Sequence, residues 1–199
     1  FRFQARFGSL PADAEAEEAC AELAATLKAL SRERIGMEMM NLLALPDPGS
    51  VAARMAELGV LGVVLPEASA APLAALLAEE QRQAIAPDPL RRLAALLPAD
   101  VAIAEGVAAR FRLSGAQKKR LASAARREAE PVPRSLAYRL GLEQALDRLL
   151  LVGADTAPLK AWAVPTFPLK GGDIVARGVV AGPQVARILR VVEDQWVAE

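Results

Sequence analysis

The chain has 199 residues, and its 24 basic and 24 acidic residues give a net charge of zero, so the overall charge predicts neither a nucleic-acid nor a membrane partner. It contains no histidine, which excludes histidine zinc sites, serine-histidine nucleophiles and imidazole acid-base catalysis. It has no apolar run of membrane-spanning length and no signal-peptide pattern, and its single cysteine, Cys20, fits a reducing compartment, so we expect a cytoplasmic protein with no membrane partner.

The composition predicts an all-α fold. Alanine and leucine dominate, only 4% of the residues are aromatic, and β-branched residues seldom alternate with polar ones. We expect an elongated array of many short helices that ends in a helix-hairpin-helix-like element.

The first third of the chain begins with an aromatic and basic helix end at residues 1–8, followed by a linker over residues 9–12. Asp13 is placed to cap a helix that runs to about Ala29, and the acidic residues after it fall in the first turns, where the helix dipole favours them. Ser31 is placed to cap the next helix.

Helix starts in the middle of the chain are marked by a serine, aspartate or proline before each apolar helical pattern. The apolar run at residues 60–65 has no evident partner strand, so we expect a buried helical turn there. The residues expected to start the other helices are Ser50, Pro72, Asp88 and Asp100.

A basic cluster lies between residues 106 and 134, where eight basic residues stand against two acidic ones. Ser114 and Gln117 have the spacing of a capping box at the start of a helix that carries most of the cluster. The cluster fits sequence-independent contacts with RNA phosphates and, equally, a solvated helix face. Its candidate RNA-binding residues are Lys118, Lys119, Arg120, Arg126 and Arg127.

The last third opens at a boundary marked by Pro131 and Pro133. One helix is expected over residues 135–151 and a short one over 158–164. This third of the chain has three large aromatic residues, Trp162, Phe167 and Trp196. They are expected to pack in its interior rather than to stack on RNA bases.

A glycine hairpin follows in the sequence LKGGDIVARGVVAGP. Asp173 is placed to cap a short helix, Gly178 to end it in a left-handed conformation, and Pro183 to start the final helix. Lys170 and Arg177 supply charge close to the hairpin, which fits a phosphate-binding site, although a buried glycine turn that docks the final helix explains the pattern equally well.

Three separated blocks resemble bacterial CCA-adding tRNA nucleotidyltransferases of the class that also contains the bacterial poly(A) polymerases. FRFQARFG at residues 1–8 resembles the end of the helix after that family's template motif. LSRERIGMEMMNLLALPDP at residues 30–48 resembles its last neck motif, and PLKGGDIVARGVVAGPQVARIL at residues 168–189 resembles its C-terminal signature. The blocks occur in the order in which that family has them.

The resemblance implies three regions, which are neck-like over residues 1–66, body-like over 67–130 and tail-like over 131–199. In the family, the catalytic carboxylates, the phosphate-binding glycines and the nucleotide template lie before the first block, and this chain begins at Phe1 without a methionine, so it is expected to be a fragment without the catalytic head. No catalytic or metal-binding residue is therefore expected in it. The resemblance gives Arg34 and Glu38 a supporting role beside the nucleotide, whereas the residues alone fit an ordinary solvated ion-pair set.

Three functions remain open on the sequence. The first is the tRNA-binding part of a CCA-adding enzyme whose absent head uses CTP, ATP and Mg²⁺ and without which this chain is inactive. The second is the same part of a poly(A) polymerase, and the third is a non-enzymatic helical interaction module. Under the first, Lys170 and Arg177 join the basic cluster as tRNA contacts.

Overall fold

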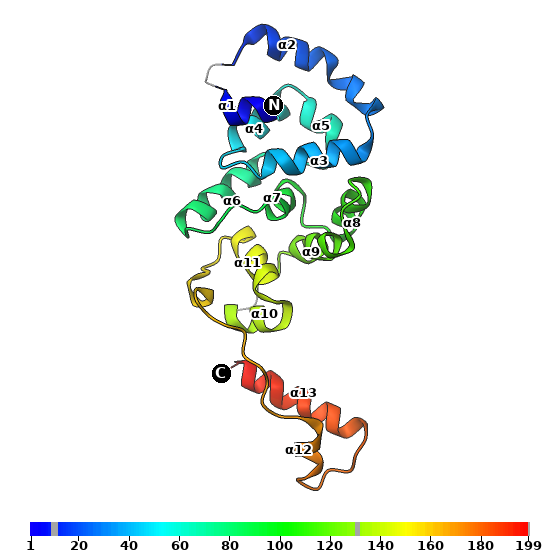
Figure 1. Ribbon diagram of the computed structural model, residues 1–199, viewed down its shortest axis with the longest axis vertical. Coiled ribbons are helices and arrows are strands. Elements are labelled where there is room, and N and C mark those ends of the chain that lie inside the picture. The colour runs from blue at the N-terminus through cyan, green and yellow to red at the C-terminus, as the bar shows by residue number, and fades with distance from the viewer. Residues whose placement is uncertain (9–11, 130–131, 199) are drawn as a thin grey trace.

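The computed structural model describes residues 1–8, 12–129 and 132–198, and within these ranges the chain forms helices and no β-strand (Figure 1). The all-α prediction is confirmed. In chain order, with η for a 3₁₀-helix, the elements are α1 (Arg2–Phe7), α2 (Ala14–Leu23), η1 (Ala24–Ala29), α3 (Arg32–Leu43), α4 (Gly49–Glu57), α5 (Val60–Val64), α6 (Ala71–Arg82), α7 (Pro89–Leu96), α8 (Val101–Arg110), α9 (Gly115–Ala125), α10 (Pro133–Leu140), α11 (Leu142–Leu151), η2 (Ala157–Leu159), α12 (Gly171–Val175) and α13 (Pro183–Ala198).

The helices form an elongated array (Figure 1). Helices α1 to α5 lie at one end, α6 to α9 follow, α10 and α11 come next, and the pair α12 and α13 lies at the far end. The predicted array of short helices with a terminal helix-hairpin-helix-like element is therefore confirmed.

Most predicted helix starts are confirmed by side-chain caps. In each case a carboxylate or hydroxyl oxygen accepts a backbone N–H from the first turn, which satisfies a donor that the helix leaves unpaired. These caps are Asp13, Ser31, Asp88, Asp100 and Ser114, the last in a complete capping box with Gln117. The helical turn expected at residues 60–65 is present as α5.

The predicted cap at Ser50 is wrong. Helix α4 begins one residue earlier, at Gly49, and Pro48 occupies the capping position without a side-chain bond. The nearby Asp47 accepts the Gly49 N–H at 3.1 Å, so an aspartate side chain stabilises the turn before the helix.

The single helix predicted over residues 135–151 is wrong, because the chain breaks it into α10 and α11 at Gly141. Gly141 has φ 85° and ψ 155°, a conformation that only glycine adopts readily. The break lets α10 and α11 pack on each other instead of continuing along one axis.

Three smaller expectations also need correction. The helix expected from Asp13 to about Ala29 changes to a 3₁₀-helix after Leu23, where the Thr26 hydroxyl donates to the Leu23 carbonyl at 2.6 Å. The helix expected over residues 158–164 is limited to η2. Asp173 lies inside α12 rather than at its start, and its carboxylate accepts the Lys170 N–H at 2.7 Å.

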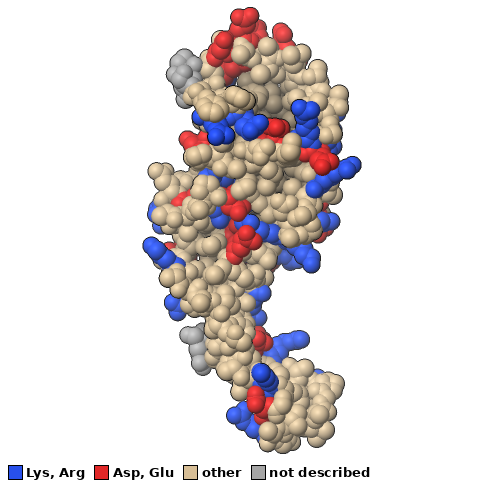
Figure 2. Space-filling model, viewed as in Figure 1, with Lys and Arg blue, Asp and Glu red and all other residues tan. Residues whose placement is uncertain are grey.

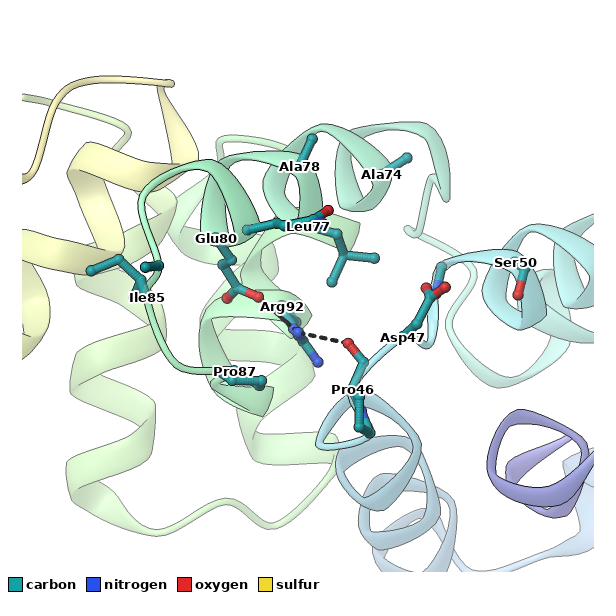
Figure 3. A pocket seen from close by; sticks show the side chains of 13 residues that line it. Pro46, Asp47, Ser50, Ala74, Leu77, Ala78, Glu80, Ile85, Pro87 and Arg92 are labelled. Atoms are coloured by element: carbon teal, nitrogen blue, oxygen red, sulfur yellow. Dashed lines mark hydrogen bonds and ion pairs between the residues drawn. The ribbon is translucent and has the colours of Figure 1, made fainter.

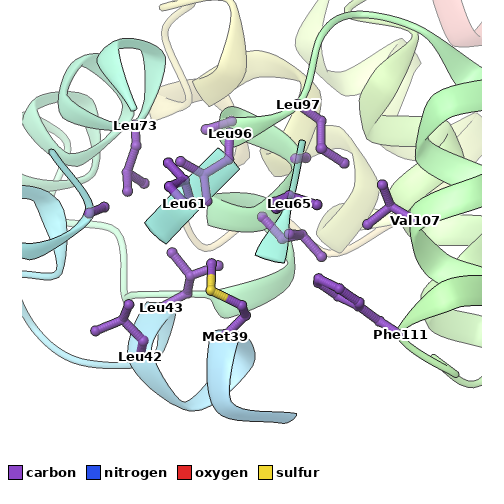
Figure 4. Close-up of a cluster of buried hydrophobic side chains, with 14 of the residues drawn as sticks. Met39, Leu42, Leu43, Leu61, Leu65, Leu73, Leu96, Leu97, Val107 and Phe111 are labelled. Atoms are coloured by element: carbon purple, nitrogen blue, oxygen red, sulfur yellow. The ribbon is translucent and has the colours of Figure 1, made fainter. Parts of the chain in front are cut away.

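The main hydrophobic core extends from η1 to α9 and includes Leu150 of α11. Figure 4 shows the part of it that runs from Met39 of α3 to Phe111 after α8. Leu43 of α3, Leu61 of α5 and Leu73 of α6 each have less than 3% of their surface exposed, and they meet Leu96 of α7 and Val107 of α8. The core therefore crosses residues 66 and 67, where the neck-like and body-like regions were predicted to meet, and that division remains a prediction.

A second, smaller cluster joins α10, α11 and η2. Its buried members include Leu136, Leu149 and Leu159, and Trp162 packs against it. Phe167 and Trp196 contact each other with ring centroids 5.4 Å apart, but both are only partly buried and belong to neither core cluster, so of the three aromatic residues only Trp162 packs against a core.

Two predicted linkers fall partly outside the described residues. Of the boundary prolines, Pro131 lies outside them, and Pro133 opens α10. Residues 9–11 of the linker predicted over residues 9–12 also lie outside them. Across the described ranges, no helix has both the length and the apolar character needed to cross a membrane.

Gly36→Ala should lower the free energy of unfolding by about 1–3 kcal/mol through overpacking, because an added Cβ would lie 2.6 Å from Phe111 Cβ and 3.0 Å from Phe111 Cα. Gly106→Ala is the matched control, since it also lies inside a helix but an added Cβ would meet nothing within 4 Å. The control should raise the free energy of unfolding by about 0.5–1 kcal/mol. Urea unfolding measures both, and equal stabilisation by the two substitutions would contradict the close packing of α3 on Phe111.

Candidate nucleic-acid interface

The predicted basic cluster divides into two groups in the structure. Lys118 and Lys119 follow the Ser114 cap in the first turns of α9, and both side chains are exposed. Neither lysine forms an ion pair or a side-chain hydrogen bond with any residue that the structure describes. Two cations without internal partners are available to contact an external anion.

Arg120, the next residue, points into the protein. Its guanidinium Nε lies 2.6 Å from Asp147 Oδ2, its Nη2 lies 2.9 Å from Asp88 Oδ2, and its Nη1 lies 2.8 Å from Glu143 Oε1. Only 12% of its side chain is exposed. Burial works against the charge, but the hydrogen bond and the charge of Asp147 outweigh it, so the pKa of Arg120 lies above its ordinary value. The charge of Arg120 is therefore paired with carboxylates inside the protein.

Asp147 of α11 is the carboxylate on which this charge cluster converges. Its side chain is 1% exposed and lies 3.5 Å from Arg91 Nη1 as well as 2.6 Å from Arg120. Burial raises the pKa of the Asp147 carboxyl, and the two guanidinium groups oppose that rise. Asp147 shares both guanidinium groups with other carboxylates, because Arg91 also pairs with Glu80 at 2.8 Å and Arg120 also pairs with Asp88.

Arg92 ties α7 to the end of α3. Its Nε lies 2.8 Å from Glu80 Oε2, and its Nη1 donates to the carbonyl oxygens of Leu43 at 2.8 Å and Leu45 at 2.5 Å. Figure 3 shows its bond to the Pro46 carbonyl, beside a cavity of about 700 Å³ between the α3–α4 turn and α6. Because these groups satisfy one another, we assign Arg92 and Glu80 a structural role.

Arg126 and Arg127 also separate. Arg126 is exposed and forms no ion pair within the described ranges. Arg127 has φ 53° and donates to the carbonyl oxygens of Ala94, Leu97 and Ala124, which lie at the ends of α7 and α9. Burial lowers the pKa of Arg127, but its charge lies where the helix dipoles are negative. Like Arg120, it is engaged in holding helices together.

The hairpin residues Lys170 and Arg177 are both exposed, and neither has an ion-pair partner in the described part of the chain. Gly178 ends the turn after α12 with φ 94°, as predicted, and Gly182 precedes α13 with φ 155°. The three acidic residues described in this region have internal partners. Asp173 bonds to the Lys170 N–H, Glu193 accepts the Tyr138 hydroxyl, and Asp194 pairs with Arg139. The hairpin cations are therefore not neutralised by these acids.

Arg34 and Glu38 lie one turn apart on α3 and line a cavity of about 220 Å³. Arg2 of α1 also lines it, and its Nε lies 2.9 Å from Glu38 Oε2. The structure thus brings Arg34 and Glu38 together with a residue from the first block of the chain. Their predicted role beside a nucleotide remains a prediction.

Further exposed basic residues include Lys28 at the end of η1 and Arg32 at the start of α3, neither of which the sequence analysis proposed as an RNA contact. Both are exposed and have no charged partner among the described residues. Their nearness to Ser31, where two helices meet, is a signal that could have identified them. They extend the list of cations that an RNA could reach.

The surface charge is uneven along the molecule. Figure 2 shows acidic side chains gathered over α2, where Glu15, Glu18 and Glu22 are exposed, while basic and acidic side chains are mixed over the middle. The acidic character is therefore confined to the exposed side of α2 in this view. No group of three metal-ligating side chains comes together within residues 1–8, 12–129 and 132–198.

Residues 12–71, from the residue before Asp13 to the start of α6, match the family model described as "Probable RNA and SrmB- binding site of polymerase A". This match supports a broad relationship to the poly(A) polymerase and CCA-adding enzymes and an RNA-binding helical region. No curated protein matches the chain.

Arg120→Ala should lower the free energy of unfolding by about 3–5 kcal/mol, because it removes the closest partner of the buried Asp147 carboxylate. Lys119→Ala, its exposed neighbour, should change the free energy by no more than about 0.5 kcal/mol. Chemical unfolding of both variants makes the comparison. Similar small effects would mean that Arg120 is not engaged with Asp147 in solution.

Proposed function

We propose that this chain is the tRNA-binding helical part of a nucleotidyltransferase that adds CCA to tRNA 3′ ends. The observation that carries RNA binding is the match of residues 12–71 to an RNA-binding region of polymerase A. The three sequence blocks, at residues 1–8, 30–48 and 168–189, resemble a class that contains both CCA-adding enzymes and poly(A) polymerases, so they support a nucleotidyltransferase of this class, and the choice of tRNA is part of the proposal.

The RNA interface consists of exposed cations without internal partners in the described structure. Arg120 and Arg127 are left out, since their guanidinium groups bond to carboxylates and helix-end carbonyls within the protein. The interface residues are Lys118, Lys119, Arg126, Lys170 and Arg177. Contacts from lysine and arginine to phosphates do not depend on sequence, which suits recognition of tRNA by its shape.

The chain contributes binding and orientation rather than bond making. Its cations hold the tRNA backbone so that the 3′ end reaches the catalytic head of the intact enzyme, which takes CTP and ATP. Mg²⁺, if bound by that head, would supply charge neutralisation for the transfer, and no residue of this chain is proposed to hold it. The described carboxylates of this chain form no metal-ligating group and do not fit the ion. Arg34 and Glu38, beside the cavity lined by Arg2, brace the nucleotide-binding region from the neck side.

A poly(A) polymerase is the second candidate, and the wording of the matched family model favours it. The helical part would hold the RNA in the same way, and the two enzymes would differ in primer and nucleotide choice. The third candidate is a helical interaction module, which differs from both in that it would not bind tRNA.

The chain should bind whole tRNA more tightly than an acceptor minihelix, with affinity that falls as salt rises. Lys118→Ala/Lys119→Ala and Lys170→Ala/Arg177→Ala should each weaken binding and flatten the salt dependence by up to about 0.7–0.9 units of slope per lost phosphate contact. Fluorescence anisotropy over a salt series measures both quantities.

The matched control is Lys118→Arg/Lys119→Arg, which keeps the charge and should keep the wild-type slope. An unchanged slope in an alanine pair would remove that pair from the interface. If the wild-type chain bound neither RNA, the interaction module would replace the RNA-binding proposal.

The chain alone should transfer no nucleotide to tRNA, because its described residues hold no metal-ligating cluster. Incubation with radiolabelled CTP or ATP, Mg²⁺ and a tRNA that lacks its CCA end measures this directly. Incorporation of label above a no-protein control would place catalytic residues within these 199 residues.

A further inference from the structure

The last two helices form a small unit with an apolar interior of its own, which we call the arm (residues 167–197). Ile174 of α12 is 5% exposed and Val185 of α13 is 8% exposed. The two helices approach closely, since a Cβ at Gly171 would lie 3.5 Å from Val185 Cγ1 and 4.0 Å from Leu189 Cδ1. The arm can therefore move as one body.

The arm is connected to the rest of the chain in a way that permits movement. Residues 160–170, between η2 and α12, contain no helix and include Pro165 and Pro168. Apart from α12, the helix against which α13 chiefly packs is α10. Figure 1 shows that an extended segment without helix connects α12 and α13, at the lower end of the array, to the rest of the chain. One helix face and one linker thus fix the position of the arm.

The contact with α10 is made by a compact set of side chains. The Tyr138 hydroxyl donates to Glu193 Oε1, and Arg139 Nη1 lies 3.1 Å from Asp194 Oδ1. The Tyr138 ring meets the edge of Trp196, with centroids 5.7 Å apart and planes at 76°. The bond to Glu193 raises the pKa of the Tyr138 hydroxyl, so it stays protonated and remains a donor at neutral pH.

These contacts are suited to reversible docking. The Arg139 and Asp194 side chains are 44% and 50% exposed, and ion pairs this exposed to water contribute little to stability. Few apolar groups are buried between α10 and α13 compared with the two clusters of the main body. An element held by a few half-exposed contacts exchanges between docked and undocked states.

We propose that the arm is hinged at residues 163–166, between Trp162, which packs on the second cluster, and the arm, and that a latch of Tyr138, Arg139, Glu193, Asp194 and Trp196 holds the arm on α10. The proposed consequence is that docking fixes the position of the exposed Lys170 and Arg177 relative to Lys118 and Lys119, so that all four contact one RNA. This consequence for RNA rests on the proposed function, whereas the latch itself does not. If RNA binds only the docked state, the apparent Kd equals the intrinsic Kd divided by the docked fraction.

The latch can be tested without RNA by pulsed electron-electron spin resonance. Spin labels are placed at Glu105→Cys on α8 and Gln184→Cys on α13, both at exposed positions, in a Cys20→Ser background. The parent should give one narrow distance distribution. Tyr138→Phe/Asp194→Asn should add a broad population, with the helical circular dichroism unchanged.

Gln195→Ala is the matched control, because Gln195 is exposed on the same turn of α13 and takes no part in the latch. Its distance distribution should equal that of the parent. If Tyr138→Phe/Asp194→Asn and the further variant with Trp196→Ala both keep the narrow distribution, the arm is rigidly fixed and the proposal is wrong.

The consequence for RNA is tested with a tRNA transcript that lacks its CCA end. The apparent Kd of Tyr138→Phe/Asp194→Asn for this tRNA should equal the parent Kd divided by the fraction of the variant whose arm is docked. A docked fraction of about one fifth therefore predicts about fivefold weaker binding. Saturating tRNA should restore the narrow distance. If the arm of Tyr138→Phe/Asp194→Asn is undocked but its affinity for tRNA is unchanged, the latch has no role in RNA binding. If the parent binds no tRNA, the proposed function is wrong, and the distance distributions still test whether the latch exists.

Discussion

The buried charge cluster around Asp147 is the constraint on which the arrangement of this molecule depends. Arg91 and Arg120 lie on α7 and α9, two helices of the main core, whereas Asp147 lies on α11, which contributes to the second cluster. A buried carboxylate without its cations would be strongly destabilising, so α11 is held in the one position that pairs them. Through Arg92 and Glu80 the same cluster reaches the end of α3. The orientation of α11 on the main core thus follows from electrostatics as much as from apolar packing.

This constraint also decides which cations remain for an external partner. Consecutive residues of a helix point about 100° apart, so in the run Lys118, Lys119, Arg120 a single step turns the side chain from solvent to Asp147. Arg126 and Arg127 also divide, but for another reason, because they follow the end of α9 and the positive φ of Arg127 accompanies its bonds to helix-end carbonyls. Only some of the basic residues in such a run of sequence therefore contribute to a basic surface.

The proposed RNA contacts are spread over the length of the array rather than gathered in one pocket. The segment that matches an RNA-binding family model covers α2 to α5, whereas the cations without internal partners lie on α9 and at the terminal hairpin as well as on η1 and α3. An extended set of phosphate contacts suits a large folded RNA, because each contact adds affinity while the spacing between contacts reads shape. The hinge of the arm would make this spacing adjustable.

The amino-acid sequence by itself determined the all-α class and most helix starts, because the bonds of Asp13, Ser31, Asp88, Asp100 and Ser114 join residues within three positions of each other. It also carried the indication of RNA binding, through blocks of matching residues. Only the tertiary structure decided the break at Gly141, which the leucine periodicity on both sides concealed, and the inward turn of Arg120. Two of the partners of Arg120 lie 27 and 23 residues further along the chain and the third, Asp88, lies before it, and no local pattern shows which cation a distant carboxylate will bind.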